Sequence, residues 1–248
     1  MTTFIELQYR KAISIADFIQ GQIFNAECYI PFEHSFYMGE NVLKIAIKPS
    51  KFTLLHDYIT YNLLESYRHS LKKVGSEIYN DIYDEFDMFG VGYVKYESYR
   101  DRDYHNYLYV LFESKVSQKL VESTFTILFN DRATMQKFNE QISFEIRKLS
   151  VNEWPLYLVR DGVMKRNTYW PKWLYAALFR REQGHCAICQ KNLTGLMANG
   201  ADPAIDHIIP LNLGGTNDPT NLQMLCAGCN TDKSGDSITT SNMHSPFW

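Results

Sequence analysis

The sequence lacks the features of a membrane-spanning or exported protein. Its 248 residues contain no apolar run near the roughly 20 residues that are needed to cross a bilayer. Charges at Glu6, Arg10, Lys11 and Asp17 interrupt the apolar core that an N-terminal secretory signal requires. We therefore expect a cytoplasmic protein that does not associate with a membrane.

The sequence also lacks a large net charge, and its value of −3 counts mildly against a nucleic-acid binder. The charge is unevenly spread: residues 160–181 hold six bases against one acid, and residues 76–103 hold eight acids against three bases. For the acidic segment, a solvated helix face followed by a hairpin is favoured over a surface that imitates nucleic acid or docks a partner. Apolar residues, at 45%, are plentiful enough to build a core.

Cysteine is scarce, with five residues in the chain, and four of them form two C-x-x-C pairs. The pairs are Cys186 with Cys189 and Cys226 with Cys229. In an intracellular protein this spacing favours a shared zinc ion over disulfides, with two separate redox pairs as the alternative. Four thiolates close the tetrahedral shell of zinc, so the predicted ion is structural. Cys28, in an apolar run, is interpreted as a small buried hydrophobic residue.

The residue patterns predict an α+β protein. Short β-rich runs favour strands over 42–47, 89–97 and 106–113, and Asp161-Gly162 indicates a hairpin. Four-residue apolar spacing predicts helices over 54–73 and 131–149, the second capped by Asn130 or Asp131, and leaves 116–129 undecided. Another helix is expected between Pro171 and Gly184. We divide the chain into an α+β recognition or regulatory domain (1–150), a connector (151–170) and a C-terminal domain (171–248).

The segment between the cysteine pairs contains several polar residues whose side chains can transfer protons or bind a metal. Asp206 and His207 are adjacent, and Gly214-Gly215 supplies a sharp turn after them. An acid, a histidine and two carboxamides are thereby brought near the predicted zinc ion. These residues, with the lysine that follows, are Asp206, His207, Asn221, Asn230 and Lys233.

The pattern D-H-I-x-P-x-x-x-G-G-x-x-x-x-x-N-L-x-x-L-C-x-x-C-N-x-x-K resembles the HNH endonuclease family, and the resemblance covers about Pro171 to Ser234. It implies a C-terminal ββα-metal nuclease domain held by the four-cysteine zinc site. His207 matches the general base, and Asp206 matches a ligand of the catalytic metal. Asn221 matches the asparagine that braces the loop and helps to place the histidine. Asn230 stands where the family most often has a histidine, as the second metal ligand.

The change at Asn230 alters the expected catalytic metal. Two oxygen ligands, from Asp206 and Asn230, form a hard site that favours Mg²⁺ or Mn²⁺ over Zn²⁺ or Ni²⁺. His207, neutral near pH 7, would take a proton from water, and the cation would neutralise the phosphate and the leaving 3′ oxygen. The resemblance implies products with 5′-phosphate and 3′-hydroxyl ends. The basic residues expected to contact flanking phosphates are Lys233 and, on the outside of the 171–184 helix, Lys172, Arg180 and Arg181.

The favoured hypothesis is a DNA endonuclease, with restriction or antiphage defence as its expected setting. A zinc-ribbon module that binds nucleic acid or a partner without cutting is one alternative, and an RNA-cleaving HNH nuclease is another. A homodimer, or a partner protein bound through residues 1–150, is also an expectation. Tyr169, Trp170 and Trp173 are expected to pack beneath the zinc module, with stacking on bases as the alternative.

Overall fold

The computed structural model describes residues 7–25, 39–96, 101–198 and 203–246 of the chain. Contacts divide the chain into two compact units, one formed by Met1–Ile19 and His56–Ile127, the other by Gln20–Leu55 and Leu128–Trp248. The domain boundaries expected near residues 150 and 170 stay a prediction. Cys28 lies outside the described residues. No described helix combines the length and the apolar composition needed to span a membrane.

The regular elements described in the first unit are all helices. Its elements are the first part of α1 (Tyr9–Phe24), most of α4 (Leu54–Val74), η1 (Gly75–Ile78), α5 (Tyr79–Met88), α6 (Asp101–Lys115) and most of α7 (Ser117–Phe129). Aromatic side chains fill much of its core: Tyr67 stacks on Phe112 with ring centroids 3.8 Å apart, and the hydroxyls of Tyr83 and Tyr104 are hydrogen-bonded at 2.6 Å. The core of this unit is therefore rich in aromatic side chains.

Three strands predicted for residues 1–150 are wrong. Residues 106–113 lie in α6, where Tyr104, Leu108 and Phe112 are all buried. Their four-residue spacing fits one face of a helix, so helical burial overrides the β-propensity of the aromatic residues. Residues 42–46 likewise belong to α3 (Glu40–Ala46). Residues 91–96 form no regular element, and residue 97 lies outside the described part of the chain.

The other local predictions agree with the structure. The helix predicted over 54–73 is α4, and the helix predicted over 131–149 is α8 (Arg132–Ile146), capped by the Asp131 carboxylate, which accepts from the backbone N–H of Ala133 and Thr134. Of the undecided residues 116–129, all but Val116 are helical, in α7. The Asp161-Gly162 hairpin joins β1 (Leu158–Arg160) to β2 (Val163–Met164). The α+β class is thus confirmed, with every described strand after residue 150.

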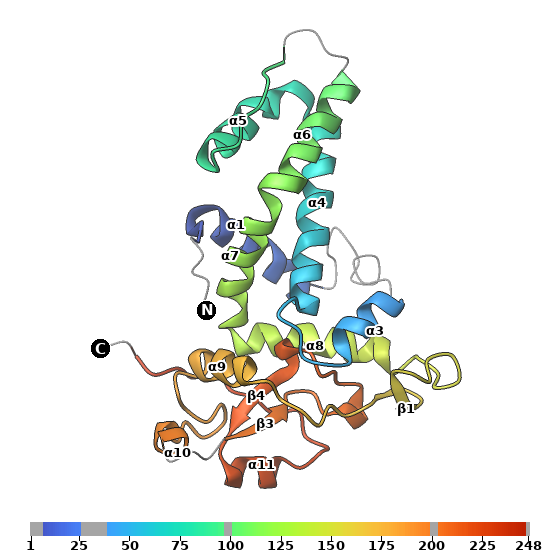
Figure 1. The fold of residues 1–248 in the computed structure, drawn as a ribbon, viewed down its shortest axis with the longest axis vertical. Coiled ribbons are helices and arrows are strands. Elements are labelled where there is room, and N and C mark those ends of the chain that lie inside the picture. The colour runs from blue at the N-terminus through green and yellow to red at the C-terminus, as the bar shows by residue number, and fades with distance from the viewer. Residues whose placement is uncertain (1–6, 26–38, 97–100, 199–202, 247–248) are drawn as a thin grey trace. The chain divides into compact units, whose positions relative to one another are not determined.

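The second unit contains the rest of the described elements (Figure 1). Besides α3, α8, β1 and β2, they are α9 (Lys172–Arg181), α10 (Thr194–Ala198), β3 (Ala204–His207), η2 (Leu211–Leu213), η3 (Pro219–Asn221), β4 (Leu222–Leu225) and α11 (Ala227–Lys233). Leu174 and Leu178 of α9 are fully buried against Leu222, Met224 and Leu225 of β4. Trp170 and Trp173 pack against the same cluster, as predicted, but the same prediction is wrong for Tyr169, which is 72% exposed. This small core supports the candidate site.

Candidate active site

Two short strands and one helix form the framework of the site. β3 pairs antiparallel with β4, and Asp206 lies opposite Gln223 while His207 lies opposite Leu222. α11 begins directly after β4, with Cys226 as its N-cap, and lies beside both strands (Figure 1). The order strand, strand, helix is the ββα arrangement that the sequence pattern predicts.

The four cysteines of the two pairs lie together in one cluster. Their Sγ atoms are all within 4.8 Å of one another, and those of Cys189 and Cys226 are 3.8 Å apart. Tetrahedral zinc, bonded to sulfur at about 2.3 Å, spaces its sulfurs about 3.8 Å apart. A hydrogen bond from the backbone N–H of Cys229 lowers the pKa of the Cys226 thiol to about 7, whereas burial raises the pKa of the Cys229 thiol. The cluster therefore fits a structural zinc ion.

The loop between β3 and β4 is held by Asn221. This side chain is fully buried, accepts from the backbone N–H of Ile209 at 2.9 Å, and donates to the carbonyls of Ile209 at 3.0 Å and Thr216 at 2.9 Å. All three polar contacts of the amide are made to backbone, so Asn221 closes the loop as a brace. Gly215 is also required, because an added Cβ would lie 1.9 Å from the carbonyl oxygen of Ile209.

Asn217 fixes the orientation of the His207 ring. Its Nδ2 donates to the carbonyls of Ile47 and Lys165, both at 2.8 Å, so its Oδ1 must face the other way. That oxygen accepts from the backbone N–H of Asn167 and lies 3.1 Å from Nε2 of His207. Since Oδ1 only accepts, Nε2 carries the proton. Nδ1 is then the ring nitrogen with a lone pair available to accept a proton.

Burial keeps His207 uncharged. The residue is 4% exposed, and the edge of Trp170 lies against it with ring centroids 5.9 Å apart. Burial lowers the pKa of His207 to about 4, even though the hydrogen bond to Asn217 acts in the opposite direction. The imidazole is therefore neutral near pH 7, which is the form that a general base requires.

The Asp206 carboxylate is oriented by two donors on the same oxygen. Oδ2 accepts from Nε2 of Gln223 at 2.9 Å and pairs with Nζ of Lys233 at 3.0 Å. The Lys233 ammonium also donates to the carbonyl of His207 at 2.6 Å, and its side chain is 1% exposed. Oδ1 forms no hydrogen bond or ion pair with the described residues, so it is the oxygen available to a cation.

Asp206, His207 and Asn230 line one cleft with a volume of about 590 Å³. The cleft is also lined by Arg166, an exposed cation. A carboxylate oxygen and an amide oxygen, with water and phosphate oxygens completing the shell, suit Mg²⁺ or Mn²⁺ better than a soft metal. The residues present therefore fit a hard divalent cation, and Asp206 and Asn230 would hold it.

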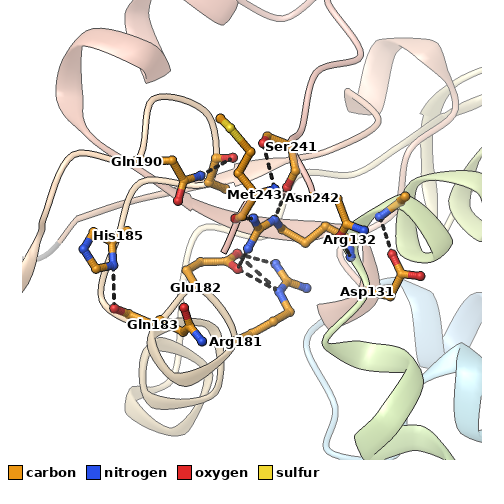
Figure 2. Close-up of polar contacts among 12 residues, drawn as sticks. Asp131, Arg132, Arg181, Glu182, Gln183, His185, Gln190, Ser241, Asn242 and Met243 are labelled. Carbon is orange, nitrogen blue, oxygen red and sulfur yellow. Dashed lines mark hydrogen bonds and ion pairs between the residues drawn. The ribbon is translucent and has the colours of Figure 1, made fainter. Parts of the chain in front are cut away.

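The expected phosphate contacts change in two places. Arg181 does not lie on the outside of α9: its side chain is 1% exposed and pairs with Glu182 at 2.6 Å (Figure 2). This correction removes Arg181 from the phosphate contacts, because a buried and paired guanidinium cannot reach nucleic acid. Lys233 is buried as well, where it holds Asp206. Lys172 and Arg180 are exposed, but neither lines the described part of the cleft.

The sequence analysis did not predict a role in the site for three residues, which are Asn217, Gln223 and Arg166. Arg166 belongs to the basic segment 160–181, which was the available signal. Asn217 and Gln223 carried none, because their roles depend on the partners that the folded loop and the strand pairing give them.

Residues 186–236 match the family model described as HNH endonuclease, which covers 51 of the 248 residues. The matched span contains the four cysteines, Asp206, His207, Asn221 and Asn230. No curated protein and no solved structure matches the chain. The C-terminal part of the protein thus carries an HNH-type domain with a four-cysteine cluster, and this family supports a nuclease activity in general.

Proposed function

We propose that this protein is a metal-dependent endonuclease that hydrolyses phosphodiester bonds of DNA, with His207 as its general base. The observation that carries the proposal is the shared cleft, where a neutral histidine with a defined tautomer lies beside the oxygen ligands Asp206 and Asn230. A family resemblance alone would not supply this tautomer.

The proposed chemistry follows from the geometry. Nδ1 of His207 accepts a proton from the attacking water, and the Nε2–H bond to Asn217 stabilises the ring as positive charge develops on it. When bound, the divalent cation neutralises the scissile phosphate and the leaving 3′ oxygen. Arg166 binds a phosphate beside the cleft, and the exposed Lys172 and Arg180 contact phosphates further along the strand. The expected products carry 5′-phosphate and 3′-hydroxyl ends.

A cleavage assay tests the proposal. Purified protein is incubated with plasmid DNA and with a structured RNA, each with Mg²⁺ or Mn²⁺, next to His207→Ala. We expect DNA cleavage by the wild type and a rate at least about 100-fold lower for the variant, as for loss of a general base. His185→Ala is the matched control, because His185 hydrogen-bonds the carbonyl of Gln183 and lies outside the cleft.

The outcomes separate the competing hypotheses. If the protein cleaves RNA and not DNA, the RNA-cleaving nuclease becomes the favoured hypothesis. If the wild-type protein binds DNA but cleaves neither polymer, the zinc-ribbon binding module is favoured. One such centre cuts one strand at a time, so linear plasmid as the first product favours a homodimer, which light scattering would detect. Restriction or antiphage defence is the proposed setting, since the nuclease module is joined to a separate helical unit suited to recognition or regulation.

A further inference from the structure

A buried ion network lies beside the nuclease module (Figure 2). Glu182 pairs with Arg132 at 2.9 Å and with Arg181 at 2.6 Å, and each of these side chains is at most 1% exposed. Arg181 also donates to the carbonyl of Leu222 in β4 and lies over the ring of Phe129, 4.6 Å from its centroid. Two guanidinium groups share one carboxylate, so N–H donors of Arg132 are left over for further acceptors.

The C-terminal segment 237–246, which we call the strap, supplies those acceptors. Nε and Nη2 of Arg132 donate to the main-chain carbonyls of Ser241 and Met243, and the Asn242 side chain accepts from the backbone N–H of Arg132 at 3.0 Å. Asn242 and Met243 are themselves exposed. Polar bonds to a buried arginine therefore hold the strap, with little help from apolar burial.

The strap also reaches the candidate metal ligand. Nε2 of Gln223, a fully buried residue, donates to the carbonyl of Thr239 at 2.8 Å and to Oδ2 of Asp206 at 2.9 Å. Both hydrogens of this amide are used, and both partners are acceptors, so the amide has one allowed orientation. Gln223 and Asp206 are directly opposed across β3 and β4, which places their side chains on one face of the sheet.

We propose that Gln223 is a positioning residue, and that the strap, locked by Arg132, orients the Asp206 carboxylate through it. With Oδ2 held by Gln223 and Lys233, Oδ1 is presented to the cation. This inference rests on the proposed function, because it assumes that Asp206 binds a catalytic metal. Arg132 and the strap both lie outside residues 186–236, so this connection to Asp206 is additional to the matched domain.

Mn²⁺ binding to zinc-loaded protein tests the proposal, measured by electron paramagnetic resonance without nucleic acid. Gln223→Leu removes both donors at similar size, and a chain ending at Ile238 removes Thr239 and the rest of the strap. We expect each change to weaken Mn²⁺ binding about 10-fold, the usual lower range for partners that orient a metal ligand. The two changes combined should weaken it no further, because they break the same connection.

Other variants keep the test independent of folding. If the shortened chain loses zinc or melts early, Asn242→Ala replaces it, because it loosens the strap by removing one acceptor from Arg132. It should weaken Mn²⁺ binding in the wild type and have no effect in Gln223→Leu. Gln136→Leu on α8 is the matched control, since Gln136 bonds Glu140 and not the site.

Asp206→Ala separates the two possible failures. Should Asp206→Ala leave Mn²⁺ binding unchanged, the proposed metal site itself is wrong, and the strap proposal falls with it. If Asp206→Ala abolishes binding while Gln223→Leu and the strap variants bind Mn²⁺ as the wild type does, only the strap proposal is overturned. Additive losses in the combined variant would also overturn it, because they would show two independent structural effects.

Discussion

The cysteine cluster and the cleft lined by Asp206 and His207 both lie at the β3–β4 pair. They differ in how far each depends on residues from elsewhere in the chain. The cluster draws every ligand from two C-x-x-C segments, and four sulfurs satisfy zinc without help from other residues. In the cleft, the Asp206 carboxylate and the His207 imidazole are each held by residues from elsewhere in the chain. Asn217 holds His207, and Gln223 and Lys233 hold Asp206.

This difference separates stability from activity. Loss of a zinc ligand should unfold the module, because the ion joins two segments that are held by a small core. Loss of a cleft residue should leave the module folded where its partners keep other bonds.

Removal of the zinc ion should have the largest effect. Structural zinc sites bind with about 10–16 kcal/mol of free energy, which is available to folding. We expect Cys226→Ser, or a strong chelator on the wild type, to abolish the thermal transition of the second unit and release its zinc. Circular dichroism melts and zinc content by atomic absorption check this. An unchanged melt after complete zinc loss would show that the core alone suffices.

His207→Ala should separate activity from stability most clearly. We expect a fall in cleavage rate of at least about 100-fold, equivalent to about 3 kcal/mol in activation free energy. The module should stay folded and keep its zinc, since Oδ1 of Asn217 still accepts from the N–H of Asn167. Cleavage rates and melting temperatures should be measured on the same samples. A variant that unfolds would contradict the separation.

Asn221→Ala should lower stability and activity together. The change leaves the N–H of Ile209 and the carbonyls of Ile209 and Thr216 without partners in a buried loop, and each such group costs about 1–3 kcal/mol. We expect the free energy of unfolding to fall by about 3 kcal/mol or more in urea titrations. Asn212→Ala in the neighbouring turn is the control for stability, because its amide bonds Asp236 at the exposed surface.

Asp218 should produce the smallest effect, a pH dependence of stability. Burial raises the pKa of Asp218 to about 6 from its ordinary value of 3.8. The fold therefore binds the proton more tightly than the unfolded chain does. The stabilisation is complete below about pH 4 and is lost as the pH rises through 6.

Asp218→Asn should remove this dependence. The Nδ2 group that this substitution introduces cannot accept from the N–H of Leu54, so the variant carries a constant loss of stability at every pH. The difference in melting temperature between wild type and variant should shrink from pH 4 to pH 7 and then stay level. A difference that grows over this range would show that the buried carboxyl ionises with a lowered pKa.

Local patterns predicted the C-terminal module better than the N-terminal region. The cysteine spacing, Asp206-His207, Gly214-Gly215 and Asn221 depend on nearest neighbours and on backbone geometry, which a sequence shows directly. In residues 1–150 the composition of the aromatic run 106–113 favoured a strand, and that prediction is wrong. The burial of Tyr104, Leu108 and Phe112 against distant helices decided for the helix.

The amino-acid sequence alone predicts the four clustered cysteines, the ββα order, and the acid, histidine and asparagine near the cleft. The folded structure was needed to show that Arg181 is buried, that Lys233 holds Asp206, and that Asn217 sets the tautomer of His207. These roles rest on hydrogen bonds between residues far apart in the chain. Burial, which makes such bonds obligatory, is a property of the packed molecule and not of any one segment.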